Sequence, residues 1–378
     1  MTQFPDAKQL FTTVTEDGKL VLSVEPYAVP EPGEHDIVVA MEAVPINPSD
    51  LGLLTAPANM ASVRHEVIDG HPALVADVDP AMLRIFAGRK GKKMPAGNEG
   101  AGTVVAAGSD ASAQALLGKK VSIVGGEMYR THRVMKAMMA VPLPDGAEAK
   151  EGASLFVNPM TAQGFVNTMR AEGHSAMVHT AAASNLGQML AKLCLKEGID
   201  LVAIVRSEEQ AAILRGIGLT HVVDSSKDGF FPALVDALAE TGATLGFDAI
   251  GGGKMANYIL TAMEQAAAKR GAEFSVYGST VNKQVYIYGR LDTGETILTS
   301  GYGLYWGLGG WLLTPHLEKV GMQRMMEMRA LSVEERNGIF ASDYTRQISL
   351  TDMTDPDIAR AFEKKATGEK FLVNPSLG

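Results

Sequence analysis

The sequence predicts an α/β protein of two domains, one built on a doubly wound parallel sheet and the other mostly β. Residues 176–207 run as strand, small-residue turn, helix and strand. From Glu151 to about Trp311, strand-like apolar runs alternate with helical periodicity. Residues 1–145 instead hold short apolar or alternating runs between turns rich in Gly, Pro and Asp. Alternation of strands with helices is typical of a parallel sheet covered on both faces.

The N-terminal part is expected to form short strands, namely Leu20–Val24, Asp36–Ala43, Gly102–Ala107 and Lys120–Val124. The alternating part is expected to contribute parallel strands at Met177–His179, Val202–Val205, His221–Val223, Leu245–Ile250 and Val285–Tyr288. Between the third and fourth of these, Phe231, Leu234, Val235 and Leu238 recur at helical spacing.

After the alternating part, the pattern predicts a helix, a strand, a helix and a strand, at Met322–Asn337, Arg346–Leu350, Ile358–Lys364 and Lys370–Val373. We expect this tail to rejoin the N-terminal domain. The predicted domains are therefore residues 1–146 completed by 323–378, and residues 147–322.

The strand–turn–helix–strand run is a candidate dinucleotide site. Its turn, Thr180–Gly187, precedes a helix with one apolar face that Gly198 ends. Such a turn directs backbone N–H groups and a helix N-terminus at a pyrophosphate. The second strand ends at Arg206 and Ser207, without the acid that would favour a free ribose 2′-hydroxyl. This pattern predicts NADPH rather than NADH.

The turn departs from a glycine-rich fingerprint, because its three key positions hold Ala182, Ser184 and Gly187. We expect the N–H groups from Asn185 through Leu186 to Gly187 to point at phosphate, with the Ser184 hydroxyl or Asn185 amide as an added donor. Gly187 should let helix and strand approach closely. The alternatives are a turn that binds nothing and an Arg206 that is only a solvated surface residue.

Composition excludes several classes of protein. The net charge of −9 over 378 residues argues against a nucleic-acid surface. The N-terminus lacks a signal pattern, and no apolar run reaches the ~18 residues of a membrane span. We therefore expect a soluble, cytoplasmic protein without nucleic-acid or membrane partners. The single cysteine, Cys194, lies on the apolar helix face and should be a buried small hydrophobe.

Several motifs in order resemble the medium-chain dehydrogenase/reductase superfamily, in its zinc-less quinone reductase and enoyl reductase branch. They are INPSD at 46–50, GNEGAG at 97–102, NPMTA at 158–162, HTAAASNLGQ at 179–188, the segment Leu245–Gly252, VYIYG at 285–289 and GEKFLV at 368–373. The resemblance implies a GroES-like β domain plus a Rossmann nucleotide-binding domain, with the active site in the cleft between them. It also implies a homodimer.

The resemblance places further residues near the cofactor or the reaction: Asn47, Asp50, Thr161, Gly251, Tyr288, Gly289 and Lys370. Asn47 would hydrogen-bond carboxamide, ribose or substrate, and Asp50 would relay a proton. Thr161 would lie near phosphates or nicotinamide, and Lys370 would reach phosphate. Ordinary alternatives remain open, among them a helix-capping Asp50, a Tyr288 that packs a core and an exposed Lys370.

Asn47 and Asn98 stand where zinc-dependent relatives carry Cys and His. Neutral amides are poor zinc ligands beside thiolate or imidazole, so we predict no catalytic zinc. Without a metal to polarise a simple ketone, an already activated acceptor is expected. The predicted function is NADPH-dependent hydride transfer to an apolar quinone or α,β-unsaturated carbonyl.

Two segments are longer than the family's compact loops, residues 55–96 and 269–283. Residues 51–65 contain no Tyr, which counts against the alternative of an enoyl-thioester reductase. A second alternative is an NADPH-binding sensor or structural protein without useful turnover. The aromatic residues Tyr302, Tyr305, Trp306 and Trp311 lie among glycines and would line an acceptor pocket or pack between subunits.

Overall fold

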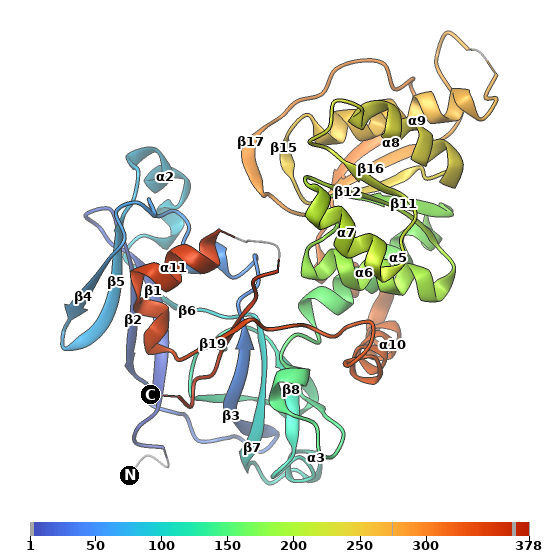
Figure 1. Cartoon of the computed structure of the whole chain (residues 1–378). Coiled ribbons are helices and arrows are strands. Elements are labelled where there is room, and N and C mark those ends of the chain that lie inside the picture. The colour runs from blue at the N-terminus through green and yellow to red at the C-terminus, as the bar shows by residue number, and fades with distance from the viewer. Residues whose placement is uncertain (1–3, 274, 365–367, 378) are drawn as a thin grey trace. The chain divides into compact units, whose positions relative to one another are not determined.

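The computed structural model describes residues 4–273, 275–364 and 368–377. The chain divides into two compact units, the first comprising Met1–Val157 with Ser332–Gly378 and the second Asn158–Leu331 (Figure 1). The sequence placed these divisions at 146/147 and 322/323. Among the described residues, no helix has both the length and the apolar character that crossing a membrane requires.

The first unit is built on two sheets. One has the strand order β4-β5-β2-β1-β6, and the other has the order β10-β8-β7-β3-β20-β19, with β9 also paired to β3. The strands are β1 (Lys8–Val14), β2 (Lys19–Pro26), β3 (Asp36–Pro45), β4 (Arg64–Ile68), β5 (His71–Asp77), β6 (Lys93–Pro95), β7 (Glu99–Ala107), β8 (Lys120–Val124), β9 (His132–Lys136), β10 (Val141–Pro142), β19 (Arg346–Ile348) and β20 (Phe371–Val373).

Short helices connect these strands. They are α1 (Leu51–Leu54), α2 (Pro80–Ile85), α3 (Ala111–Gln114), α4 (Ala149–Gly152) and α11 (Pro356–Glu363), with 3-10 turns η1 (Ala87–Arg89), η2 (Ala137–Met139) and η3 (Thr351–Thr354). The C-terminal strand β20 pairs antiparallel with β3, at Leu372 with Pro45 and Val373 with Val44. Strand residues of both chain ends therefore share one core, in which Val44 and Val373 are fully buried.

The extended segment 55–96 adds structure that its sequence pattern did not reveal. Its strands β4 and β5 form an antiparallel hairpin, and β5 pairs with β2. The segment returns through α2 and η1 to β6, which pairs with β1. The insertion thus widens one sheet of the first unit at both edges.

The second unit is a parallel sheet with the strand order β13-β12-β11-β14-β16-β18. Its strands are β11 (Ala176–His179), β12 (Asp200–Val205), β13 (Val222–Asp224), β14 (Leu245–Asp248), β16 (Lys283–Ile287) and β18 (Trp306–Gly310), and a separate parallel pair joins β15 (Gly251–Gly253) to β17 (Asp292–Thr296). The order is the 3-2-1-4-5-6 order of dinucleotide-binding sheets, whose switch point here lies between β11 and β14.

Helices cover both faces of this sheet. They are α5 (Val157–Ala171), α6 (Asn185–Glu197), α7 (Glu208–Ile217), α8 (Phe230–Thr241) and α9 (Met255–Lys269). A further helix, α10 (Leu313–Glu334), is hydrogen-bonded to α5. Figure 1 shows α6 and α7 on the opposite side of the sheet from α8 and α9. Side chains of α8 and α9 pack with apolar side chains of β11, β12 and β16, as expected for strands covered by helices.

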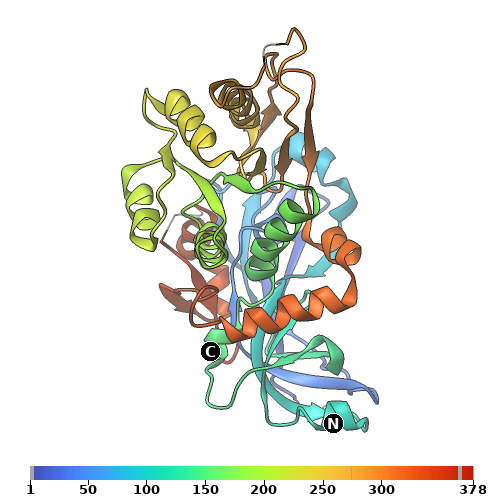
Figure 2. The same cartoon turned by 90° about the vertical axis from the view of Figure 1, so that its right-hand side faces the viewer.

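Most predicted elements are present, but many of their boundaries differ from those predicted. The strand expected to reach Ile250 ends at Asp248, whose carboxylate accepts the N–H groups of Ile250 and Gly251 and turns the chain. The helix expected at Met322–Asn337 begins at Leu313 and breaks at Gly321, where φ is 82°. Figure 2 shows its two segments meeting at an angle. The last strand begins at Phe371, one residue later than expected.

Two local predictions in α6 are confirmed. Gly198 ends the helix in the left-handed conformation, at φ 65°. Cys194 is buried, and burial raises the pKa of its thiol to about 12, as befits an inert packing residue.

The four aromatic residues of the glycine-rich segment do not form one cluster, although Tyr302 packs edge-on against Trp306. Tyr302 is buried, and its hydroxyl donates to Asn257 Oδ1 at 2.6 Å. Trp311 packs edge-on against Phe165. Tyr305, by contrast, is exposed. The predicted extension at 269–283 includes residue 274, which lies outside the described residues.

Candidate functional site

The turn between β11 and α6 is a tightly packed helix start. Ser184 is the N-cap of α6, and its Oγ accepts the N–H of Gly187 at 3.2 Å. A Cβ at Gly187 would lie 2.2 Å from the carbonyl oxygen of Ala182, so no larger residue fits. The expected close approach is therefore present, between helix and turn rather than between helix and strand.

This capping changes which donors the turn presents. The Gly187 N–H was expected to face phosphate, but Ser184 Oγ already accepts it. The N–H donates locally because a Ser at an N-cap position satisfies an otherwise unpaired helix donor. The hydroxyl hydrogen of Ser184 can still be donated, since the hydroxyl uses a lone pair toward Gly187. A helix N-terminus remains at the carboxyl end of β11, where the family pattern places a pyrophosphate.

Arg206 and Ser207 follow β12 directly. The Arg206 side chain is exposed, while its backbone N–H donates to Gln210 Oε1 at 3.1 Å. Ser207 caps α7 by accepting the N–H of Gln210 at 3.3 Å. The backbone at this strand end is thus held by the start of the next helix, while the guanidinium extends into solvent.

The carboxyl ends of β11 and β14 are joined by a buried polar contact. Thr180 Oγ1 donates to Asp248 Oδ1 at 2.8 Å and accepts the N–H of Ala249 at 2.7 Å. The same carboxylate holds the N–H groups of Ile250 and Gly251. This contact fixes the backbone at the switch point of the sheet, the place where open α/β sheets bind ligands.

Gly251 and Gly289 allow two loops beyond this edge to touch. Gly251 has φ +80°, and a Cβ there would lie 2.7 Å from the carbonyl oxygen of Gly289. A Cβ at Gly289 would lie 2.8 Å from the carbonyl oxygen of Ala249. Side chains are excluded at both positions by backbone, which leaves the backbone itself as the surface presented there.

Tyr288 has a partner that sequence reasoning missed. Its hydroxyl and His179 Nε2 lie 2.7 Å apart, and the two rings stack with Phe165 packed against both. Burial lowers the pKa of His179 to about 3, so this imidazole is neutral. Burial likewise raises the pKa of Tyr288 above its ordinary range, with the Asp248 carboxylate adding to the effect. The half-buried Tyr288 ring thus packs against His179 and Phe165, while its backbone borders the Gly251–Gly289 contact.

Thr161 is buried within α5. That position is compatible with the ordinary helical role left open for it and leaves a cofactor role as a prediction.

In the first unit, Asn47 is paired with a buried carboxylate. Asn47 Nδ2 donates to Glu99 Oε1 at 2.8 Å, and both residues are only 1% exposed. Glu99 Oε2 accepts the N–H groups of Phe156 and Val157 at 2.8 and 2.9 Å. A carboxylate accepts and does not donate, so it fixes the Asn47 amide with its nitrogen toward Glu99.

Asp50 occupies the N-cap position of α1 without capping it through its side chain. Its Oδ2 instead accepts the N–H of Asn47 at 2.8 Å, which closes the Asn47–Asp50 turn on itself. Burial raises the pKa of Asp50 to about 7, and the nearby Glu99 carboxylate adds to that shift. Burial also raises the pKa of Glu99. The capping role considered for Asp50 is therefore replaced by a carboxyl that changes protonation near neutral pH.

Lys370 is half-buried rather than exposed. Its Nζ donates to Ser154 Oγ at 2.9 Å and to Ser342 Oγ at 3.2 Å, and Tyr344 donates its own hydroxyl to Ser154 Oγ at 2.8 Å. Burial lowers the pKa of Lys370 to about 8, although the carboxyl groups of Glu99 and Asp50 act in the opposite sense. The amine is thus held away from bulk water beside two acids.

Asn47, Asp50, Glu99 and Lys370 together form what we call the Asn47 cluster. Two of its oxygens, Asn47 Oδ1 and Asp50 Oδ1, are buried and have no hydrogen-bond partner among the described residues. Buried polar atoms without partners are uncommon and often mark places where a ligand or water binds. Asn47 Oδ1 is an acceptor and needs a donor, whereas Asp50 Oδ1 accepts when the carboxyl is ionised and donates when it is protonated.

The Asn98 side chain points to a different partner from that of Asn47. Asn98 Nδ2 donates to Ser49 Oγ at 3.1 Å. Across the residues that the structure describes, no three His, Cys, Asp or Glu side chains come together in a way that could hold a metal ion. Metal independence remains a prediction that rests on the two amides.

Glu99 is the main residue of this cluster that sequence reasoning overlooked. It lies inside the GNEGAG motif and begins β7, an otherwise apolar strand. A charged residue in a strand whose neighbours are all small or apolar is a signal, because unpaired charges are almost never fully buried.

Curated relatives resemble the chain at low identity. Prostaglandin reductase-3 of Bos taurus is 28% identical over 198 residues, which cover 52% of this chain and 44% of the relative. Quinone oxidoreductase of Pseudomonas aeruginosa is 25% identical over 158 residues, covering 41% and 48%. A mitochondrial enoyl-[acyl-carrier-protein] reductase of Xenopus tropicalis is 24% identical over 209 residues, covering 54% and 52%. The chain thus spans about half the length of these relatives.

Solved structures match nearly the whole chain. A protein of Mesorhizobium loti assigned as an NADPH:quinone reductase has a TM-score of 0.73 at 24% identity, covering 98% of this chain and 99% of the other. A mycobacterial protein solved with NADPH has a TM-score of 0.65 at 17% identity, covering 98% and 100%. No family model matches the chain.

These matches confirm the predicted fold class, a GroES-like β domain with a Rossmann parallel-sheet domain. They also confirm the resemblance to the quinone reductase and enoyl reductase branch of the medium-chain dehydrogenase/reductase superfamily.

Proposed function

We propose that this chain is an NADPH-dependent, zinc-independent oxidoreductase that reduces an apolar quinone or α,β-unsaturated carbonyl. The observation that carries the proposal is the second unit's sheet. Its 3-2-1-4-5-6 order places the close-packed Gly187 turn and Arg206 at the carboxyl ends of adjacent strands, β11 and β12. The names of the relatives, quinone oxidoreductase and enoyl reductase among them, support the reaction class.

The residues of the second unit fit NADP(H), which supplies the hydride when bound. The α6 N-terminus and the Ser184 hydroxyl would hold the pyrophosphate, and Arg206 with Ser207 the 2′-phosphate. Asn185, Leu186 and Gly187 would border the phosphates. The backbone of Gly251, Tyr288 and Gly289 would border the nicotinamide, with Thr161 nearby. The structural support for this assignment is the close packing of the α6 N-terminus on its turn, where a Cβ at Gly187 would lie 2.2 Å from the carbonyl oxygen of Ala182.

The Asn47 cluster would orient and polarise the reacting groups. Asn47 Oδ1 is a buried acceptor without a partner among the described residues, suited to a carboxamide N–H. Asp50, whose pKa burial raises to about 7, would hold the proton that reduction of the acceptor requires. Lys370 would reach a phosphate of the cofactor through its half-buried amine.

A homodimer is part of the proposal. The edge strand β18 is glycine-rich and carries no charge, and Leu304, Tyr305 and Leu312 beside it are exposed. An uncharged, unpaired edge of this kind favours strand pairing with another chain. A cytoplasmic location remains a prediction from sequence.

An enoyl-thioester reductase is the second candidate, favoured by relatives of that name. One assay separates the candidates: consumption of NADPH with quinones, enones, enoyl thioesters and aldehydes, before and after exhaustive chelation. Turnover of quinones or enones that survives chelation supports the proposal. Turnover of enoyl thioesters alone favours the second candidate. Tight NADPH binding without turnover of any acceptor indicates a sensor, and activity lost with a stoichiometric zinc overturns metal independence.

Arg206→Ala tests the cofactor assignment separately. We expect it to weaken NADPH binding by roughly 1.5–3 kcal/mol, the contribution of a hydrogen bond to a charged group, and to leave NADH binding unchanged. Titrations of both cofactors against both proteins measure the difference. A matched control is Arg215→Ala, because Arg215 lies in the last turn of α7 and pairs with Glu208 on the surface. Equal losses for the two cofactors would remove Arg206 from the site.

A further inference from the structure

We propose that Arg89, contributed by the extended segment 55–96, is the positioning residue that holds the Asn47–Asp50 turn through helix α1. This inference rests on the proposed function, since it assigns that turn to the reaction. The extended segment would then be more than an insertion in a sheet, because one of its side chains supports the candidate catalytic residues.

Helix α1 is a single turn, too short to satisfy its backbone groups by hydrogen bonds within the helix. It spans four residues, Leu51–Leu54, directly after Asp50. The N–H groups of Leu53 and Leu54 donate to the carbonyl oxygen of Asp50, which binds the helix to the turn. Carbonyl groups in the last turn of any helix lack partners within the helix, and here nearly the whole helix is its last turn.

Arg89 supplies donors to those carbonyls. Its Nη1 donates to the carbonyl oxygens of Gly52 at 2.8 Å and Ala56 at 2.9 Å. Its Nη2 donates to the carbonyl oxygen of Leu53 at 3.1 Å and to Thr12 Oγ1 at 3.0 Å.

Thr12 reinforces the same end of the helix. Thr12 is a fully buried residue of β1 whose hydroxyl also donates to the carbonyl oxygen of Leu53, at 2.7 Å. The guanidinium therefore joins the end of α1 to a strand of the core. Its planar fork suits several carbonyl groups at once, and a positive charge at a helix C-terminus is favourable.

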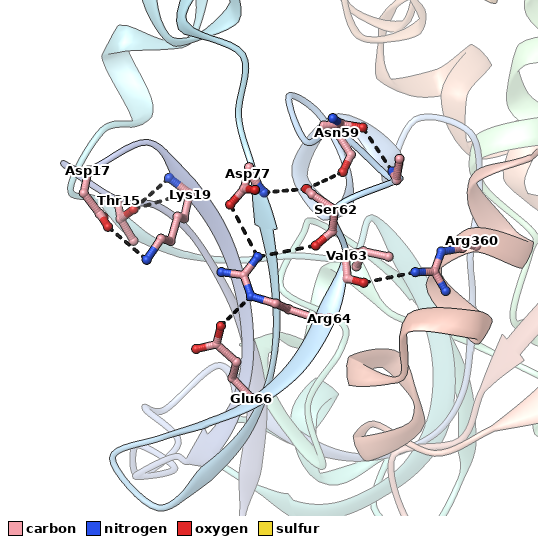
Figure 3. A network of polar contacts seen from close by, with 11 residues as sticks. Thr15, Asp17, Lys19, Asn59, Ser62, Val63, Arg64, Glu66, Asp77 and Arg360 are labelled. Carbon is pink, nitrogen blue, oxygen red and sulfur yellow. Dashed lines mark hydrogen bonds and ion pairs between the residues drawn. The ribbon is translucent and has the colours of Figure 1, made fainter.

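The contact with α1 distinguishes Arg89 from the other arginines of this region. Arg64 pairs with Glu66 and Asp77 and donates to the carbonyl oxygen of Ser62 (Figure 3). Arg360 from α11 donates to the carbonyl oxygen of Val63 at 3.0 Å (Figure 3). Both contact residues between Ser62 and Asp77, whereas Arg89 contacts the helix that follows Asp50. Arg360 therefore provides a matched control, an arginine bound to backbone in the same segment but not to α1.

The test compares Arg89→Ala, Arg89→Lys and Arg360→Ala in the full chain. We expect Arg89→Ala to lower kcat between about tenfold and a hundredfold, the cost of moving a reacting group by ~1 Å, with KM for NADPH unchanged. Millimolar guanidinium should restore part of the lost kcat, because it can enter the space left by the side chain, whereas methylammonium should not. Arg89→Lys should retain an intermediate kcat. Arg360→Ala should keep the wild-type kcat.

A role in stability alone predicts other results. Wild-type kcat in Arg89→Ala would overturn the inference, and so would a loss that guanidinium does not restore and that Arg360→Ala shares. Hydrogen exchange over residues 47–56 gives a readout without activity. Faster exchange in Arg89→Ala than in Arg360→Ala is expected, and equal exchange contradicts the inference. If the wild type oxidises no NADPH with any acceptor, the proposed function fails, and the exchange result alone decides whether Arg89 holds the turn.

Discussion

Two buried groups of charged residues, one in each unit, differ in how completely their polar atoms are paired. In the second unit, the fully buried Lys283 donates to Glu264 at 2.7 Å, Ser279 at 3.0 Å and the carbonyl oxygen of Val281 at 2.8 Å. Both oxygens of Glu264 accept hydrogen bonds from Ser279 as well. We call Glu264, Ser279 and Lys283 the Lys283 cluster. In the Asn47 cluster, two side-chain oxygens have no partner among the described residues.

The pKa values of the carboxyl groups follow this difference. Burial alone would raise the pKa of Glu264, but the hydrogen bonds from Lys283 and Ser279 outweigh it and the pKa is lowered. In Asp50 and Glu99, burial outweighs the hydrogen bonds and the pKa is raised. A completed ion pair is typical of a structural role, here fixing the segment that precedes β16. An incomplete group of acids is the kind of site in which perturbed pKa values accompany function.

The largest effect is expected from breaking the complete cluster. Lys283→Met leaves Glu264 without its cation and should lower the free energy of unfolding by about 3–5 kcal/mol. Lys269→Met is the control, because Lys269 pairs with Asp236 on the surface. This substitution should change the free energy of unfolding by about 1 kcal/mol or less. Urea unfolding measures both.

The same pair of variants has a pH signature. Stability that Glu264 contributes is present above its unfolded pKa of 4.5 and is lost as the pH falls through its lowered native value. The difference in free energy of unfolding between wild type and Lys283→Met should therefore become smaller at acid pH. If Lys283→Met and Lys269→Met lose the same free energy of unfolding, the Lys283 pair stabilises the protein no more than a surface pair.

The incomplete cluster should show the opposite pH dependence. The native pKa of Asp50, about 7, lies above the unfolded value of 3.8, so the native state keeps a proton that the unfolded state gives up. Asp50 therefore lowers stability as the pH rises through that window, on the order of 1.4 kcal/mol per pKa unit.

Asp50→Asn keeps an acceptor for the Asn47 N–H and should remove this slope. Unfolding by urea at several pH values compares the two proteins. Asp110→Asn is the control, because the pKa of Asp110 is lowered by its hydrogen bonds to Ser112 and should affect stability only below 3.8. An unchanged slope in Asp50→Asn would mean that Asp50 ionises normally in the native state.

The smallest change in stability is expected from Glu99→Gln. Gln can still accept from Phe156 and Val157, and no buried charge remains, so the free energy of unfolding should change by only about 1 kcal/mol. The Gln amide would then face the Asn47 nitrogen, and the Asn47 amide should reverse. That reversal replaces the unpaired acceptor with a donor.

Turnover should therefore fall while stability hardly changes, which kcat and urea unfolding measure together. Glu151→Gln is the control, because Glu151 is a half-buried residue in the first turn of α4 that also accepts a backbone N–H, that of Glu148 at 2.7 Å. A large loss of stability in Glu99→Gln with wild-type kcat would place Glu99 with the structural ion pairs instead.

The sequence by itself determined five of the six strands of the second unit's parallel sheet and the tight turn that follows β11. Strands β11 and β12 are continuous apolar runs, α6 has one apolar face ended by Gly198, and Gly187 is the residue that the close approach requires. These signals are local, since the periodicity of a strand or helix and the need for a missing Cβ are written within a few residues.

Only the tertiary structure decided the partners of the candidate site. Asn47 meets Glu99 from 52 positions away, and Lys370 meets Ser154 from 216 positions away. The hairpin in segment 55–96 and the hydrogen bonds from Arg89 to α1 were likewise not predicted from the sequence. Such pairings carry no periodic signal, because they follow from which strands lie side by side. The same packing removes the carboxyl groups from water, so it also decides which of them, Asp50 or Glu264, has a raised pKa and which a lowered one.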